Sequence, residues 1–221
     1  MYHSRFSYSG SLHSKIATER LRRRLYLFYP KLFKIKYGKA LSLGDGVLFR
    51  GLPLIDMCDG ARISLGNNVT LNSRNFGHHV LLHSPVKLMA DRKGAIIEVG
   101  DHTRIHGSCL HAYKRISIGK GCLIGANTNI IDGNGHDLAF DNVEQRYKTL
   151  GEATEVIVED NVWIGMNCIV LRGTHIGHGS VISVGSVIRG NVPPLCIFGG
   201  NPARLIKQYE ETSSRTDGGF E

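Results

Sequence analysis

Aliphatic residues recur at every sixth position through the C-terminal half of the chain. The unbroken series is Val158, Ile164, Val170, Ile176, Ile182 and Ile188. The fourth residue after each of these is small or β-branched, beginning with Val162 and Cys168. An α-helix repeats every 3.6 residues and a flat strand every two, so a period of six fits neither element.

A six-residue period is typical of a parallel β-helix. Each hexapeptide is predicted to form a short strand and a bend, and three of them complete one turn of a triangular prism in about 18 residues. The aliphatic side chains are expected to fill the narrow core, with the small residue of each repeat beside them. Gly and Asn are expected at the corners, where a positive φ is needed.

The same spacing returns upstream, so the β-helix is predicted to extend over residues 41–211. It is regular over 99–131 and weaker over 41–98. The phase slips between Ile130 and Val158, which are 28 residues apart, four more than four repeats. Such a slip indicates a segment pushed out of a regular coil, and residues 132–155 are therefore predicted to form an extruded loop.

The two ends of the chain lack the period. Residues 1–40 form a basic arm in which Ile16 to Phe28 have helix-like apolar spacing, and Pro30 is expected to end that helix. The arm either caps the first coil with a solvated outer face or touches an anionic membrane or partner. Ala203 to Glu211 is predicted to form a short C-terminal helix, and residues 212–221 a disordered tail.

The composition limits the class of protein. Glycine supplies 27 of 221 residues, about 12% against a usual 7%, yet follows no collagen-like period, and 42% hydrophobic residues argue against disorder. The five cysteines form no C-x-x-C pair, which favours reduced thiols in a cytoplasmic protein over disulfides or structural zinc. Cys122 and Cys168 are predicted to be buried core residues. No apolar run long enough for a transmembrane helix is present, nor a signal peptide.

The formal net charge is +8, and much of the excess lies between Arg20 and Lys39. A basic balance suggests an anionic partner, which could be nucleic acid, anionic lipid or a phosphorylated ligand. No nucleic-acid-binding module is visible, so nucleic acid is not expected as the partner.

Five motifs, in order along the chain, resemble one known family. They are Asp132-Gly133-Asn134-Gly135-His136-Asp137, Val162-Trp163-Ile164-Gly165, Val184-Gly185-Ser186-Val187-Ile188, Val192-Pro193-Pro194 and Gly199-Gly200-Asn201-Pro202-Ala203-Arg204. Together they resemble the hexapeptide-repeat O-acetyltransferases of the galactoside, maltose and xenobiotic acetyltransferase group. The resemblance implies a left-handed parallel β-helix, a homotrimer with active sites in the clefts between prisms, and acetyl-CoA as acetyl donor with no metal.

The resemblance also implies a catalytic residue. A sugar hydroxyl needs a general base to attack a thioester near neutral pH, and histidine is suited to that task. His136 matches the family's base, and Gly133 and Gly135 let the backbone turn sharply around it. Whether a carboxylate or a backbone carbonyl orients the imidazole stays open at this stage.

Further residues match positions that bind substrates in the family. Asn127 matches a residue that holds the acceptor hydroxyl, although a corner Asn in positive φ is an equal alternative. Trp163 matches a ring beside the catalytic histidine, or fills space. The acetyl-CoA positions are Gly165, Met166, Val184, Gly185, Arg189, Arg204 and Lys207, with the last three near the nucleotide phosphates and ordinary surface charge as their alternative.

The organisation is closest to acetyltransferases encoded with bacterial surface polysaccharides. The expected acceptor is therefore a hydroxyl of a sugar or polysaccharide precursor, with an amino sugar and N-acetylation as the alternative. Such precursors are often lipid-linked at the inner face of the membrane. The basic arm is accordingly expected to hold a cytoplasmic enzyme at that surface.

Two other functions fit only part of the sequence. His106 and His111, five apart, with His83 upstream, have the spacing of the zinc site in γ-class carbonic anhydrases, which share the prism. That pattern leaves the 132–137 loop and the 201–204 motif unexplained. A binding scaffold built on Arg22, Arg23 and Arg24 would suit phosphate contacts, but accounts for none of the motifs.

Overall fold

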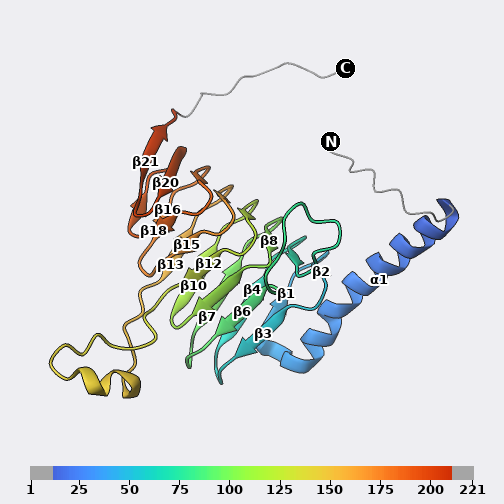
Figure 1. Ribbon diagram of the computed structural model, residues 1–221. Coiled ribbons are helices and arrows are strands. Elements are labelled where there is room, and N and C mark those ends of the chain that lie inside the picture. Colours follow the sequence, from blue (N-terminus) through green and yellow to red (C-terminus); the bar gives the residue numbers. More distant parts are fainter. Residues whose placement is uncertain (1–11, 211–221) are drawn as a thin grey trace.

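The computed structural model describes residues 12–210, with side chains from Arg24 onwards, and its body is a three-sided prism (Figure 1). Apart from the last strand, successive strands belong to three sheets in rotation, so each of them pairs with the third strand before and after it. This arrangement is a left-handed parallel β-helix. We call the bend between the second and third sheets the second corner, and the bend between the third and first sheets the third corner.

Each sheet contains one strand from nearly every turn of the chain. The first sheet contains β1 (Leu41–Leu43), β4 (Arg62–Leu65), β7 (Ile96–Val99), β10 (Arg115–Ile118), β13 (Val156–Val158), β16 (His175–Ile176) and β19 (Asn191–Val192). The second contains β2 (Leu48–Arg50), β5 (Thr70–Asn72), β8 (Arg104–His106), β11 (Leu123–Ile124), β14 (Trp163–Ile164), β17 (Val181–Ile182), β20 (Cys196–Gly200) and β21 (Ala203–Gln208). The third contains β3 (Leu54–Met57), β6 (Lys87–Ala90), β9 (Cys109–Ala112), β12 (Asn129–Ile131), β15 (Ile169–Val170) and β18 (Val187–Ile188).

The periodic aliphatic residues line the interior of the prism, as the sequence predicts. All six from Val158 to Ile188 are buried, and so are the small or β-branched residues four places after each. The register keeps each aliphatic above its equivalent in the previous turn; for example, Ile164 pairs with Ile124 below and Ile182 above. The core is therefore one continuous column in which each coil contacts its neighbours.

The glycines that follow the aliphatic residues are needed for a reason other than the expected positive φ. Gly100, Gly119, Gly125 and Gly165 do not have positive φ, but a Cβ on Gly100 would lie 2.6 Å from the backbone of Gly119 and Lys120 in the next coil. These glycines let adjacent coils approach closely. The left-handed residue lies two places later, as at Asn127 and Asn167, whose φ values are 60° and 56°.

Helix α1 (Leu12–Tyr37) runs past Pro30, so the prediction that Pro30 ends the helix is wrong. Proline removes one helical hydrogen bond, but here Pro30 is itself buried. Phe33 stacks edge-on against the core ring of Phe49 at 5.5 Å, and the Tyr37 hydroxyl donates to the Ile55 carbonyl. Packing against the first coil thus stabilises the helix beyond the proline.

The face of α1 that packs differs from the one read from the sequence. Tyr29, Phe33 and Tyr37 pack against the core, whereas Leu25 and Phe28 are 40% and 51% exposed. A short 3₁₀ turn, η1 (Gly38–Ala40), then leads into β1. Within residues 12–210, no helix has the length and apolar character needed to cross a bilayer.

The predicted C-terminal helix over Ala203 to Glu211 is also wrong. Residues Ala203–Gln208 form β21, which pairs antiparallel with β20. Strand β20 is the last parallel strand of the second sheet, and without β21 its free edge would leave backbone N–H and C=O groups without partners. Satisfying that edge outweighs the helix propensity of the segment. The predicted tail, 212–221, lies outside the described residues.

The chain leaves the prism once for a long excursion. Between β12 and β13, residues 132–155 project away from the body at the third corner and include the 3₁₀ turn η2 (Val143–Lys148), drawn in yellow in Figure 1. A second, shorter excursion lies between β5 and β6 at the second corner and covers residues 73–85.

Candidate active site

The base of the long loop is fixed by Asp132. Its side chain is completely buried, and its carboxylate accepts hydrogen bonds from the backbone N–H groups of Tyr113, Lys114 and Arg115 at 2.6–2.8 Å. The Asp132 carbonyl accepts a further bond from the Thr154 N–H at 2.7 Å, where the loop returns. A buried carboxylate satisfied by three amides anchors the loop to the previous coil.

The loop then narrows so that its two arms lie close together. The Asn134 N–H bonds to the Glu152 carbonyl at 2.9 Å, and Gly133 forms an isolated bridge with Ala153. A Cβ on Gly151 would collide with the carbonyl oxygens of Asn134 and His136, so only glycine fits at Gly151. These contacts fix the backbone position of His136, which lies between Asn134 and the rest of the loop.

His136 is exposed at the surface of the loop. Among residues 24–210, no side chain or carbonyl forms a hydrogen bond with its imidazole, and the adjacent Asp137 uses its backbone N–H to bond the Thr149 hydroxyl at 2.9 Å. The ring is thus presented outwards from a loop whose backbone is well anchored. Within the described part of one chain it faces no group that could orient it.

The second corner brings four of the sequence-predicted acetyl-CoA positions into one row. Gly165 and Met166 lie on one coil, and Val184 and Gly185 on the next. The N–H of Gly165 bonds to Ile182 O at 2.9 Å, and that of Gly185 to Met166 O at 2.9 Å, so both are used between coils. The described structure gives no such partner to the N–H groups of Met166 and Val184, which are the remaining donors along this row.

Asn127 occupies the same corner, one coil before Met166. Its φ of 60° is that of a corner residue. Its side-chain oxygen accepts from the His83 N–H at 2.9 Å, and its amide nitrogen donates to the Leu81 carbonyl at 3.0 Å. Both ends of the amide therefore hold the 73–85 loop against the prism.

Trp163 lies on the outer face of the second sheet. The ring is 54% exposed, and it pairs in register with Leu123, which is 42% exposed. These two side chains form an apolar surface next to the Gly165–Met166 bend. Such a surface suits contact with another molecule or another subunit.

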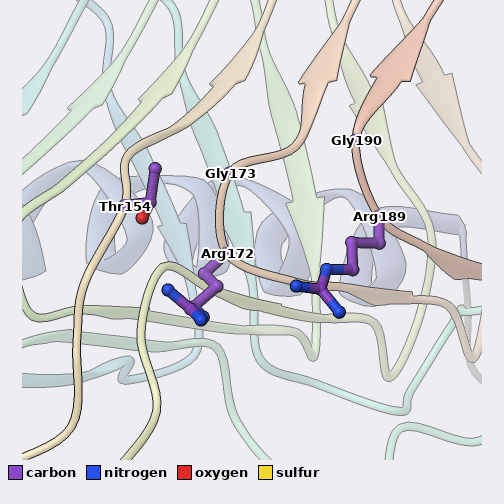
Figure 2. A pocket seen from close by; sticks show the side chains of 5 residues that line it. All are labelled: Thr154, Arg172, Gly173, Arg189 and Gly190. Carbon is purple, nitrogen blue, oxygen red and sulfur yellow. The ribbon is translucent and has the colours of Figure 1, made fainter.

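Arg189 lies at a different corner from the Gly165–Gly185 row. It lines a cavity of about 230 Å³ at the third corner together with Thr154, Arg172, Gly173 and Gly190. Arg172 and Arg189 project from neighbouring coils, as Figure 2 shows. Arg172 pairs with Glu152 at 3.0 Å, whereas no carboxylate among the described residues pairs with Arg189.

Arg172 was missed in the sequence, although a signal for it exists. Both arginines are followed by glycine, as Arg172-Gly173 and Arg189-Gly190, and both pairs lie in the third corner of successive coils. The other two predicted basic residues lie on β21, where both are exposed. The Arg204 guanidinium bonds its own neighbour's carbonyl, and the Lys207 ammonium lies 4.7 Å from the centre of the Tyr209 ring.

The thiols and the remaining histidines are distributed as follows. Cys122 and Cys168 are buried, as predicted, and burial raises the pKa of both thiols. His106 contacts His78, whereas His111 pairs with Asp91 at 3.1 Å. Among the side chains of residues 24–210, no group of three potential ligands could hold a metal ion.

Comparisons with known proteins agree with this geometry. The family described as bacterial transferase hexapeptide (six repeats) matches residues 155–190, and the hexapeptide repeat of succinyl-transferase matches residues 115–133. The putative lipopolysaccharide biosynthesis O-acetyl transferase WbbJ of Escherichia coli K12 is 31% identical over 148 residues, which cover 62% of this chain and 72% of WbbJ. The chain belongs to the hexapeptide-repeat O-acetyltransferases.

Other relatives named as putative acetyltransferases match over shorter stretches. The putative acetyltransferase YvoF of Bacillus subtilis is 36% identical over 46% of this chain, and the putative acetyltransferase YJL218W of Saccharomyces cerevisiae is 33% identical over 56%. The chain spans 53% and 61% of the length of these two relatives.

Solved structures of hexapeptide-repeat enzymes share the fold. The polySia specific acetyltransferase NeuO matches with a TM-score of 0.58 and 22% identity, over 80% of each chain. A point mutant of AntD, an N-acyltransferase from Bacillus cereus solved with dTDP and coenzyme A, matches with a TM-score of 0.63 and 20% identity, over 81% of this chain and 89% of AntD.

Proposed function

We propose that this enzyme moves an acetyl group from acetyl-CoA to a hydroxyl of a sugar or surface-polysaccharide precursor. The name of WbbJ refers to lipopolysaccharide biosynthesis, NeuO to polysialic acid, and the AntD crystals contain coenzyme A. The observation that carries the proposal is the anchored loop 132–155, which carries an exposed histidine, His136, next to its anchored base.

His136 acts as the general base in this proposal. Its ring nitrogen takes the proton of the acceptor hydroxyl as the oxygen attacks the thioester carbonyl. The carbon–sulfur bond then breaks, the acetyl group stays on the sugar oxygen, and the proton passes from His136 to the departing thiolate. No acetyl-enzyme is formed, which fits the burial of Cys122 and Cys168.

Acetyl-CoA would occupy the row at the second corner. The N–H groups of Met166 and Val184 are available to the thioester carbonyl and to the negative charge that develops on its oxygen. Trp163 and Asn127 lie beside this row and would contact the acceptor side. For the phosphates we propose Arg189, Arg204 and Lys207, together with Arg172, which lines the same cavity as Arg189.

These assignments require more than one chain. His136 leaves the prism at the third corner, and the Gly165–Gly185 row lies at the second, with the third sheet between them. A homotrimer would place the loop of one subunit across the row of its neighbour and complete the site. Cyclic assemblies of this kind are common among soluble homo-oligomers.

Helix α1 would hold the trimer at the inner face of the membrane. Outside its packed side chains, the helix exposes the apolar residues Leu25, Phe28, Leu32 and Ile35. The segment from Arg24 to Ala40 contains no acidic residue and five basic ones. An apolar stripe with basic flanks suits the interface of an anionic bilayer, and we expect binding to anionic liposomes at low salt that Phe28→Ser weakens.

The proposal is tested by measuring thiol release from acetyl-CoA against a panel of sugars, nucleotide sugars and oligosaccharides. Transfer to a hydroxyl, located by mass spectrometry and NMR, supports the proposal. Amino sugars belong in the panel because AntD is named an N-acyltransferase. Acetylation of the amine alone would move the enzyme to N-acetylation, and stoichiometric bound zinc with no transfer would contradict both.

A further inference from the structure

The second sheet and the 73–85 loop together form a basic surface that the proposed reaction does not use. Six residues define this arginine–histidine cluster: Arg50, Arg74, His78, His79, Arg104 and His106. They come from β2 and β8, the two strands that flank β5, or from the loop that follows β5. Residues far apart in the sequence are thus gathered at one edge of the prism.

The register of the β-helix builds one side of the cluster. Arg50, Asn72 and His106 are aligned across three parallel strands, and Arg104 lies two residues before His106 on the same outer face. Arg50 and Arg104 are exposed, while Asn72 between the strands is buried. Their guanidinium groups are therefore accessible to a ligand on this face.

The loop builds the other side. The imidazoles of His78 and His106 share a hydrogen bond between Nε2 and Nδ1 of 3.1 Å, and the ring of His79 stacks on His78 at 4.6 Å. The guanidinium of Arg74 is fixed by a 3.0 Å bond to the Tyr26 hydroxyl. The three imidazoles thus lie against the strand face that carries Arg50 and Arg104, and Arg74 lies where the loop leaves β5.

The positive charge of the cluster is not neutralised within residues 24–210. None of the ion pairs there involves Arg50, Arg74 or Arg104. Burial lowers the pKa of His106 to about 4, and the charges of His78, Arg50, His79 and Arg104 contribute to this shift, with no carboxylate opposing them. The same positive charges that disfavour protonation of His106 attract an anion to the cluster.

The cluster lies next to the proposed reaction row. Asn127 holds the loop through His83 and Leu81, one coil from Met166. His106 is one coil before Asn127, and coils are about 4.8 Å apart, so the cluster begins roughly 10 Å from the Met166 N–H. A short saccharide bound at the row would reach it.

We propose that the arginine–histidine cluster binds an anionic group of the acceptor, a carboxylate or a phosphate, so that the enzyme acetylates an acidic saccharide. Guanidinium groups pair with either anion through two parallel hydrogen bonds, and imidazole N–H groups add donors. The inference rests on the proposed function for the identity of the acceptor, but the anion site itself does not.

Binding is tested on the full-length protein without turnover. Glucuronate, glucose 1-phosphate and inorganic phosphate are the anionic probes, and glucose is the neutral one. We expect the anions, and not glucose, to shift the imidazole NMR signals of His78 and His106 and to give saturable calorimetric binding. A preference for glucuronate or for glucose 1-phosphate identifies the anion.

Kinetics then test whether the site serves the acceptor. The double variant Arg50→Gln with Arg104→Gln should raise KM for a uronic-acid oligosaccharide by about tenfold or more, and leave KM for acetyl-CoA unchanged. The matched control is Arg62→Gln, which removes an exposed arginine from the first sheet. It should change neither constant.

Each outcome separates the two proposals. Anion binding without transfer to any sugar would overturn the proposed function and keep the anion site. Transfer with no anion binding, or with equal use of acidic and neutral acceptors, would overturn the anion site alone. A rise confined to KM for acetyl-CoA would assign the cluster to the phosphates of coenzyme A and contradict the inference.

Discussion

At the scale of single residues, the proposed reaction depends most on His136, the general base. Its backbone is anchored through Asp132 and Gly151, while its ring has no partner within the described chain. A base that is held by its backbone and left free at its ring is ready to meet a hydroxyl brought by another molecule.

We therefore expect His136→Ala to lower kcat by roughly 10²–10⁴ with little change in the affinity for coenzyme A. Steady-state kinetics and calorimetric titration with coenzyme A measure the two effects. His102→Asn is the matched control, because His102 is an exposed corner residue with a φ of 60° that asparagine also tolerates. Turnover retained by His136→Ala would exclude this residue as the base.

His106 makes stability depend on pH. Its folded-state pKa of about 4 lies below the usual 6.5, so between these values the unfolded chain binds a proton that the folded chain does not. The free energy of unfolding is therefore expected to fall as the pH drops from 6.5 to 4. Because the ring is only partly buried, we expect a loss on the order of 1–2 kcal/mol.

Chemical denaturation at pH 7.5 and pH 4.5 measures this loss. His106→Asn should flatten the difference between the two pH values, whatever its effect on stability at pH 7.5. His102→Asn, which removes an exposed imidazole, should leave the difference unchanged. An identical slope in wild type and His106→Asn would contradict the assignment.

At the residue scale, the sequence predicts the burial of residues that follow the six-residue period. It does not predict the partners of residues that lie outside that period. Ile164 and Cys168 are found buried because their spacing alone places them inside the prism. Arg172 and His78 acquire partners only through folding, since coil stacking and the path of the 73–85 loop bring those partners close. Such contacts are long-range in sequence and leave no periodic signal.

Among the elements, the coil is the unit that the sequence predicts well, because its strand and bend are specified within six residues. The terminal elements were less predictable. Pro30 lies inside α1, and Ala203–Gln208 is a strand, because each segment gains more from a neighbouring surface or edge than its local propensity contributes. Those surfaces exist only after the prism has formed.

The close approach of the coils leads to a prediction about stability. Gly100→Ala should lower the free energy of unfolding by about 1–3 kcal/mol, because the new Cβ would lie 2.6 Å from the backbone of the next coil. Gly135→Ala is the control, since the nearest atom to its Cβ is the Tyr113 hydroxyl at 3.6 Å. Equal stability of the two variants in urea denaturation would refute the stacking argument.

The whole molecule is where the proposed site is completed. The variant His136→Ala lacks the base on the loop, and Val184→Arg blocks the exposed row. If loop and row come from different subunits, each variant can supply the part that the other lacks. Co-expressed chains should form mixed trimers in which about one quarter of the sites combine an intact loop with an intact row.

Turnover of the co-expressed mixture measures this complementation. We expect about one quarter of wild-type activity, whereas mixing the two purified proteins without subunit exchange should give almost none. Sedimentation checks that both variants and the mixture have the same mass. Absence of recovery in mixed trimers would place the loop and the row of one site in the same chain.

The nearest-neighbour stacking of the coils has a consequence for how such an enzyme changes its substrate. Asn127, on the coil that precedes Val156, holds the 73–85 loop, and no hydrogen bond among the described residues joins this loop to the coils after Val156, so the two regions can diverge almost independently. A graft that replaces the loop between Asn72 and Val86 would exchange the recognition of the acceptor while leaving the donor end untouched. The stacked coils thus hold each loop at a fixed distance from the acetyl group, and one loop can be replaced by another without changing that distance.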